Sequence, residues 1–109
     1  MKTGNYEPDN LIAGDFPRVT GWLEIPAGTL RRGTVLTSGG AAMESGGEPH
    51  AVLAEDADAS AEAVQAPVFL TGEFALRHLI LDGGAEPAAE DVAALRSLSI
   101  FAKETVPAA

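Results

Sequence analysis

VTGWLEI, residues 19–25, is the stretch that decides the fold class. Its side chains divide into two alternating sets, Val19, Gly21, Leu23 and Ile25 in one and Thr20, Trp22 and Glu24 in the other. Because successive side chains of a strand point to opposite faces, this alternation predicts a strand with one buried face. Short apolar stretches bounded by turn residues recur toward the C-terminus, which is typical of a mostly β domain.

Four further strands are expected on the C-terminal side. They are predicted at residues 33–37, 51–54, 63–74 and 99–106. The stretch 63–74 is the longest, and Pro67 inside it favours an edge strand or a bulge because proline has no N–H to donate.

The connections and one helix complete the expected fold. Turns are predicted at residues 26–28, 55–58 and 82–84, a flexible glycine-bracketed loop at 38–50, and either an extended stretch or a short helix at 74–81. A helix is predicted over residues 87–98, where Pro87 suits the first turn, Glu90 and Asp91 suit the positive end and Arg96 suits the negative end. We therefore expect residues 19–109 to form one compact β-rich domain, a small barrel or sandwich-like α+β fold with one short helix.

Composition limits the classes of function. The chain has 109 residues, 16 acidic and 7 basic side chains, a net charge of −9 and no cysteine. This charge argues against binding to a nucleic-acid backbone, and the lack of cysteine excludes disulfides and thiolate zinc sites. No stretch is apolar enough for a signal peptide or a membrane span, so we expect a soluble protein that is not secreted.

The search for catalytic chemistry finds no residue set. His50 and His78 stand alone, and no serine lies in a nucleophile elbow. A calcium loop starting at Asp56 would need glycine and glutamate where Ala61 and Pro67 stand. The sequence therefore predicts no catalytic, cofactor or metal site and no enzyme activity.

Residues 1–18 form an expected N-terminal arm without helix or strand periodicity. Bulky apolar side chains recur in it at Tyr6, Leu11, Ile12 and Phe16, although proline and glycine interrupt it. Disordered tails usually lack such side chains. Two interpretations remain open: the arm orders on a partner protein, or it folds back onto its own domain.

Several stretches of the sequence resemble one family of viral proteins. The stretch from Tyr6 to Pro17 resembles the N-terminal arm of tailed-phage head decoration proteins, and RGTVL at 32–36 resembles their first core strand. AVLA at 51–54, the acidic turn and PVFLTGEF at 67–74 resemble the middle of the lambda-type head protein D. The resemblance is one of order and spacing and covers roughly residues 6–106.

The resemblance implies a viral capsid decoration, or cementing, protein. Members of this family bind as homotrimers at local three-fold positions of the expanded phage head, on the outer surface of the virion, after synthesis in the host cytoplasm. Their arms order against the major capsid protein, with no role for nucleic acid or membrane. The arm residues expected to bind the capsid are Tyr6, Pro8, Leu11, Ile12, Phe16 and Pro17.

The alternative is a small β-barrel that binds a ligand, or an accessory domain of an enzyme complex. Such a domain needs a pocket with convergent polar groups, for which Trp22, Arg77 and His78 are the candidates. The two interpretations differ in their mutational consequences. If the arm anchors the protein to a capsid, alanine at Leu11, Ile12 and Phe16 weakens attachment with little loss of thermal stability.

Overall fold

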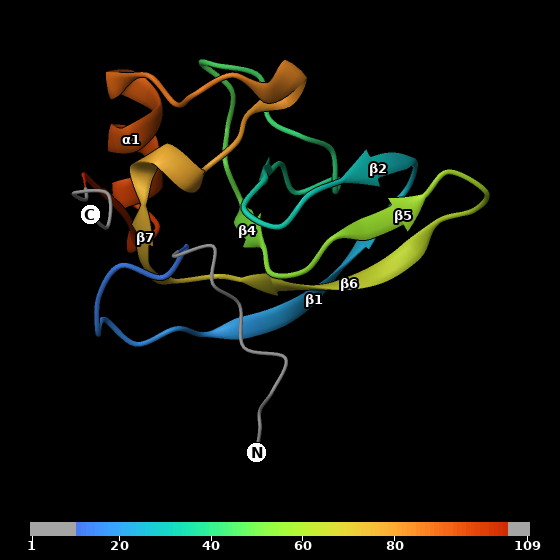
Figure 1. Cartoon of the computed structure of the whole chain (residues 1–109), viewed down its shortest axis with the longest axis horizontal. Coiled ribbons are helices and arrows are strands. Elements are labelled where there is room, and N and C mark those ends of the chain that lie inside the picture. Colours follow the sequence, from blue (N-terminus) through green and yellow to red (C-terminus); the bar gives the residue numbers. More distant parts are fainter. Residues whose placement is uncertain (1–10, 105–109) are drawn as a thin grey trace, which may run out of the picture.

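Eight strands and one α-helix form within residues 11–104, the part of the chain that the computed structural model describes (Figure 1). The elements are β1 (Thr20–Ile25), β2 (Gly28–Leu30), β3 (Val35–Leu36), β4 (Ala51–Leu53), β5 (Ala57–Ala59), β6 (Val64–Phe69), β7 (Gly72–Ala75), α1 (Ala89–Arg96) and β8 (Ile100–Lys103). Single 3-10 turns at Leu76–His78 and Asp82–Gly84 lie between β7 and α1. The protein is thus mostly β with one short helix, as the sequence predicts.

The strands form one larger sheet and two pairs. The four-stranded sheet is antiparallel throughout and has the order β1-β6-β4-β3. β2 pairs antiparallel with β5, and β7 pairs parallel with β8. In Figure 1, β1 and β6 run side by side along one border of the molecule, with β7 and α1 toward the opposite end.

β3 and β4 are apolar on both faces because each face covers a separate core. Neighbouring residues divide between the cores: Val35 and Val52 enter the first, whereas Leu36, Ala51 and Leu53 enter the second. The first core also takes residues of β7, α1 and β8, and the second takes Ala57 and Ala59 of β5. Because successive side chains of a strand point to opposite faces, consecutive apolar residues contact the cores on both sides of the sheet.

β1 differs from β3 and β4 because only one of its faces is covered. Ile25 is fully buried and Leu23 packs against the second core. On the other face, Thr20 and Glu24 are exposed and 71% of Trp22 is accessible to solvent. The prediction of a strand with one buried face is confirmed for β1, whereas Val19, predicted on the buried face, is 51% exposed and precedes the strand.

Two strands occupy positions where the sequence predicted turns. β2 begins at Gly28, within the expected 26–28 turn, and β5 covers residues 57–59, within and beyond the expected acidic turn. The two pair with each other, Gly28 opposite Ala59 and Leu30 opposite Ala57. The turn predictions were wrong here because strands of three residues take their stability from a distant partner rather than from a local pattern.

Pro67 lies in an inner strand rather than at an edge or bulge. β6 is bordered by β1 and β4, and Pro67 stands opposite Trp22. In an antiparallel strand the N and O atoms of a residue face the same neighbour. The Pro67 carbonyl accepts a hydrogen bond from the Ala54 amide at 3.0 Å, so it points toward the β4 side of the strand. The position of the missing N–H points to the same side, where the paired residues of β4 end at Leu53. The proline therefore costs no bond of the β1–β6 ladder.

The other predicted strands and the predicted helix form, but they begin and end at other residues than expected. The stretch 63–74 divides into β6 and β7, and the helix is shorter than the predicted 87–98. β8 forms inside the predicted 99–106 strand. The loop 38–50, expected to be flexible, is held at Met43, which is fully buried and whose amide donates to the Val35 carbonyl at 2.9 Å.

Candidate functional site

Among residues 11–104, neither His50 nor His78 forms an ion pair with an acidic side chain. His50 is exposed, whereas His78 is partly buried, and its Nε2 has no hydrogen-bond partner within residues 11–104. The described part of the chain contains no group of three or more His, Cys, Asp or Glu side chains able to hold a metal ion.

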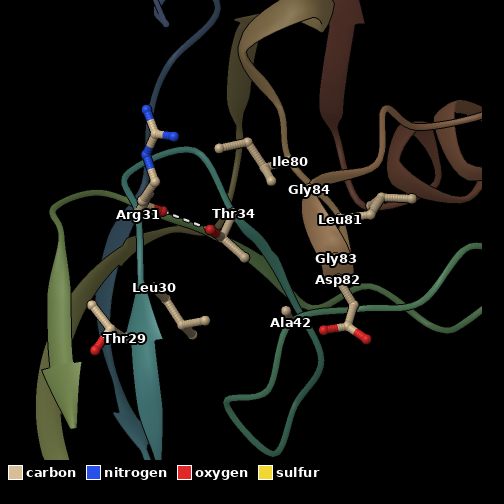
Figure 2. A pocket seen from close by; sticks show the side chains of 10 residues that line it. All are labelled: Thr29, Leu30, Arg31, Thr34, Ala42, Ile80, Leu81, Asp82, Gly83 and Gly84. Carbon is tan, nitrogen blue, oxygen red and sulfur yellow. Dashed lines mark hydrogen bonds between the residues drawn. The ribbon is translucent and has the colours of Figure 1, made fainter. Parts of the chain in front are cut away.

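A shallow pocket of about 280 Å³ lies between the β2 end and the Asp82–Gly84 turn (Figure 2). Its lining includes Leu30 and Ile80, with Arg31 and Asp82 as the charged side chains. These two side chains point away from each other, and the Thr34 hydroxyl already donates to the Arg31 carbonyl at 2.6 Å. The polar groups do not converge, and none of the three predicted pocket candidates Trp22, Arg77 and His78 lines the pocket.

Two aspartates with lowered pKa values serve the fold. Burial raises the pKa of Asp91, but the amides of Gly46 and Ala88, at 2.7 and 2.9 Å, and the Ser45 hydroxyl, at 2.8 Å, donate to its carboxylate and outweigh burial. This carboxylate therefore ties the 38–50 loop to the start of α1. The pKa of Asp58 is lowered by the Ser60 hydroxyl and amide, so its carboxylate closes a local turn.

The segment 11–18 is attached to the edge of β7. The Ala13 amide donates to the Glu73 carbonyl at 2.9 Å, and the Ala75 amide donates to the Leu11 carbonyl at 2.7 Å. Ile12 stands opposite Phe74 in an antiparallel bridge. The segment thus extends the β7–β8 pair by a short third strand.

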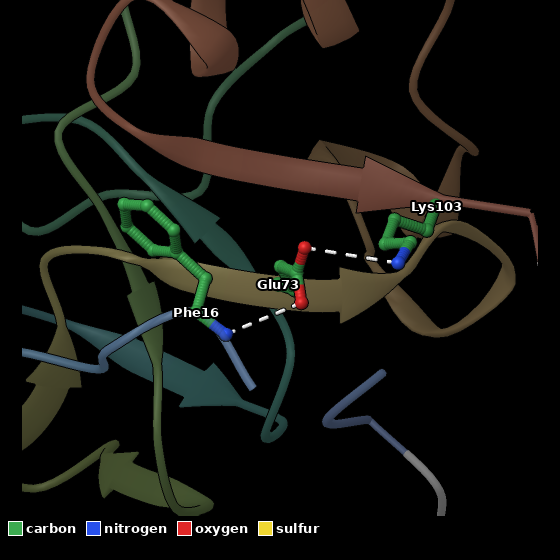
Figure 3. Close-up of polar contacts among 3 residues, drawn as sticks. All are labelled: Phe16, Glu73 and Lys103. Carbon is green, nitrogen blue, oxygen red and sulfur yellow. Dashed lines mark hydrogen bonds and ion pairs between the residues drawn. The ribbon is translucent and has the colours of Figure 1, made fainter. Parts of the chain in front are cut away.

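Glu73 fixes the next turn of this segment through both carboxylate oxygens (Figure 3). Its Oε1 accepts from the Phe16 amide at 3.2 Å, and its Oε2 lies 3.7 Å from Lys103 Nζ. The Phe16 ring packs edge-on against Phe101 with centroids 5.0 Å apart. A Cβ on Gly14 would overlap the Glu73 carboxylate, so a larger residue at position 14 would displace this carboxylate from its present position.

The six predicted arm residues therefore lie in different environments. Leu11 is 1% exposed within the first core, and Ile12 is partly buried beside it. Phe16 and Pro17 are exposed, with 36% of Phe16 accessible. Tyr6 and Pro8 lie outside the described residues.

This distribution corrects one part of the anchor prediction. Leu11 is a core residue of its own domain, because its side chain is enclosed by β3, β4, β7 and β8 residues of the first core. Of the two open interpretations, folding back onto the domain therefore holds for Leu11 and Ile12. The attached segment 11–18 belongs structurally with the domain that was expected to begin at residue 19.

Sequence reasoning did not find the residues that hold this segment. Thr71 accepts from the Val19 amide at 3.0 Å and donates to the Pro17 carbonyl at 2.7 Å, next to the bonds that Glu73 makes. One signal in the sequence could have found them. Polar Thr71 and Glu73 alternate with Gly72 and Phe74, which are buried, and this alternation places the two polar side chains on the same face of the strand.

Comparisons with known proteins supply no further assignment. Neither the family models nor the curated proteins contain a match to this sequence. Among residues 11–104, no helix has the length and apolar character needed to cross a membrane.

Proposed function

We propose that this chain is a capsid decoration protein, which binds the outer surface of an expanded tailed-phage head as homotrimers at local three-fold sites. Bound trimers stabilise the shell against the pressure of packed DNA. The observation that carries the proposal is the attachment of segment 11–18 to the β7 edge by main-chain bonds and by Glu73. The ten residues before Leu11, including Tyr6 and Pro8, therefore start from a fixed point on a small β domain.

The attachment of this segment suits a clamp. A ligand that binds only the expanded shell stabilises that state by mass action and needs no chemistry of its own. A trimer carries three copies of residues 1–10, so after one copy binds, the others bind at a high effective concentration. Weak individual contacts then give firm attachment. Phe16 and Pro17 are exposed on the attached segment and are available as additional contacts.

The ligand-binding alternative has less support. One pocket open to a ligand is the shallow one beside Arg31 and Asp82, whose polar groups diverge. Ligand sites usually place a few polar groups so that they converge on the bound molecule. The attachment of segment 11–18 to β7 also has no role in that function.

Sedimentation with capsid shells tests the proposal. The purified protein is mixed with expanded, undecorated shells and, separately, with unexpanded procapsids, both assembled from the major capsid protein of a tailed-phage head. We expect saturable pelleting with expanded shells alone, at one trimer per local three-fold site. Folded protein that pellets with neither shell would overturn the proposal and favour the ligand-binding domain.

A further inference from the structure

We propose that the outer edge of β1 accepts an extended segment of the capsid shell protein as an added strand, with Trp22 as the side-chain anchor. The identity of the partner rests on the proposed function. The surface differs from the β7 edge to which segment 11–18 is attached: it consists of residues Thr20–Leu23 at the free side of the four-stranded sheet, and we call it the β1 edge.

The direction of the main-chain groups follows from the β1–β6 register. The Leu70 amide donates to the Val19 carbonyl at 2.6 Å, directly before Thr20 stands opposite Phe69. Residues that exchange hydrogen bonds alternate with residues that do not in an antiparallel pair. Gly21, Leu23 and Ile25 therefore bond to β6, and the N–H and C=O groups of Thr20, Trp22 and Glu24 point away from the sheet.

These outward groups have no partner strand within residues 11–104. β1 is the first strand in the sheet order, and its described hydrogen-bonded neighbour is β6 (Figure 1). Protein edges are usually protected by short length, proline, lysine or a bulge. β1 has six residues, none of them proline or lysine, and its register with β6 is continuous.

The Glu24 end of the strand is closed by the chain after β3. Gly40 lies so near the Glu24 carbonyl that an added Cβ would overlap its oxygen, and Gly40 has a φ of 84°. Both facts require glycine at this position. An incoming segment therefore has room along Thr20–Leu23 and stops beside Gly40.

Trp22 lies at the middle of the open stretch. Its side chain is 71% exposed on the uncovered face, beside partly buried Pro67 on β6. Tryptophan is enriched among the residues that dominate binding energy, since it buries a large apolar area in one side chain. An outward main-chain edge and a central aromatic anchor are the two requirements of strand addition.

Symmetry favours the shell protein over a second copy. Pairing β1 with another β1 is a two-fold contact, which a three-fold assembly does not contain. Glu24 shares the outer face with Trp22, so the occupant is an extended segment with a basic residue near Glu24 and apolar residues beside Trp22.

The experiment uses two variants of the full chain and one control. Thr20→Pro removes an outward N–H at the first residue of the strand, where proline is tolerated, and Trp22→Ala removes the anchor. Leu98→Ala is the control, because Leu98 is also an exposed apolar residue, 37% accessible, and lies just after α1. Thermal unfolding checks that all three variants fold, and sedimentation with expanded shells measures affinity.

A spectroscopic readout reports burial of the anchor directly. Trp22 is the one tryptophan of the sequence, so replacing it biosynthetically with 5-hydroxytryptophan gives a probe that is excited apart from tryptophans of the shell. We expect the emission to shift to shorter wavelength on shell binding. We also expect Thr20→Pro and Trp22→Ala to weaken binding at least tenfold while Leu98→Ala leaves it unchanged.

The outcomes separate this inference from the proposed function. Wild-type binding without an emission shift, together with wild-type affinity of both β1 variants, overturns the strand-addition site and leaves decoration intact. No wild-type binding overturns both. A variant that changes the oligomeric state of the isolated protein but not shell affinity assigns the β1 edge to contacts between copies and also overturns the inference.

Discussion

Leu11 shows how one buried side chain changes the interpretation of a whole segment. It is enclosed in the first core with Val52 and Phe74, and its carbonyl accepts from the Ala75 amide at 2.7 Å. A residue held in this way contributes to the stability of its own domain, so it is not available as an anchor for another protein. Phe16, which is 36% exposed, retains that role in the proposed function.

Leu11→Ala should therefore destabilise the fold. Truncating a fully buried leucine removes apolar contacts and leaves a cavity, which costs about 3 kcal/mol of unfolding free energy. Phe16→Ala is the matched control and should cost less than about 1.5 kcal/mol, because a third of that side chain is already in water. Chemical denaturation of both variants measures the difference, and equal stabilities would show that the first core does not depend on Leu11.

Asp91 should make stability depend on pH in the acidic range. Its pKa is lowered in the folded state by donors from Ser45, Gly46 and Ala88, so the ionised form contributes stability above the unfolded value of about 4. That contribution is lost as pH falls through the lower folded value. Asp91→Asn should cost about 2 kcal/mol at neutral pH, and the difference from wild type should shrink below about pH 4.

The control for this prediction is Asp82→Asn, which removes the same charge from an exposed position. Denaturant titrations at several pH values compare the two variants with wild type. If Asp91→Asn lowers stability equally at neutral and at strongly acidic pH, the prediction is wrong. The loss would then come from altered packing rather than from removal of the ionised carboxylate.

At the scale of the elements, the β7–β8 pair is completed by a segment that is not itself a named strand. Residues 11–13 bond to β7 through the main chain, and Glu73 then holds the following turn through the Phe16 amide and Lys103. Pro67 presents a comparable case, because its place in an inner strand depends on where β4 ends. In both places the hydrogen-bonding groups of the neighbouring strand decide how the segment pairs.

Glu73→Ala should loosen the segment 11–18 locally. The Phe16 amide loses its acceptor, so its hydrogen exchange should become at least several-fold faster. The Val19 amide, which donates to the Thr71 hydroxyl, is the internal control and should keep its rate. Amide exchange followed by NMR distinguishes the two, and an unchanged Phe16 rate would mean that Glu73 does not hold the segment.

For the whole molecule, the division into two cores decides which part of the N-terminus can be removed. The first core contains Leu11, whereas residues 1–10 lie outside the described structure. A deletion that ends before Leu11 and one that extends to Pro17 therefore test different properties. The first tests partner binding, and the second also removes a core side chain.

Deleting residues 1–10 should leave a folded protein that no longer binds expanded shells. Deleting residues 1–17 should in addition lower thermal stability, because the Leu11 side chain and the main-chain bonds to β7 are lost. Thermal unfolding and shell sedimentation of both deletions measure the two effects. Full binding by the shorter deletion would contradict a capsid-binding role for Tyr6 and Pro8.

The sequence by itself determined the fold class, the β1 faces and the existence of α1. Each of these depends on local chemistry: side chains alternate along any strand, and proline, acids and a base favour defined ends of a helix. Exposed Trp22 opposite buried Ile25 could therefore be predicted from residues 19–25 alone.

Only the tertiary structure decided what Leu11, Pro67, β2, β5 and Asp91 do. β2 and β5 are too short to be specified locally and form because residues 28–30 meet residues 57–59. Leu11 and Asp91 acquire their roles from residues distant in sequence. Leu11 shares the first core with Phe74, and Asp91 accepts hydrogen bonds from Ser45 and Gly46. The physical reason is that periodicity is a property of neighbouring residues, whereas pairing and burial depend on which distant segments the folded chain brings together.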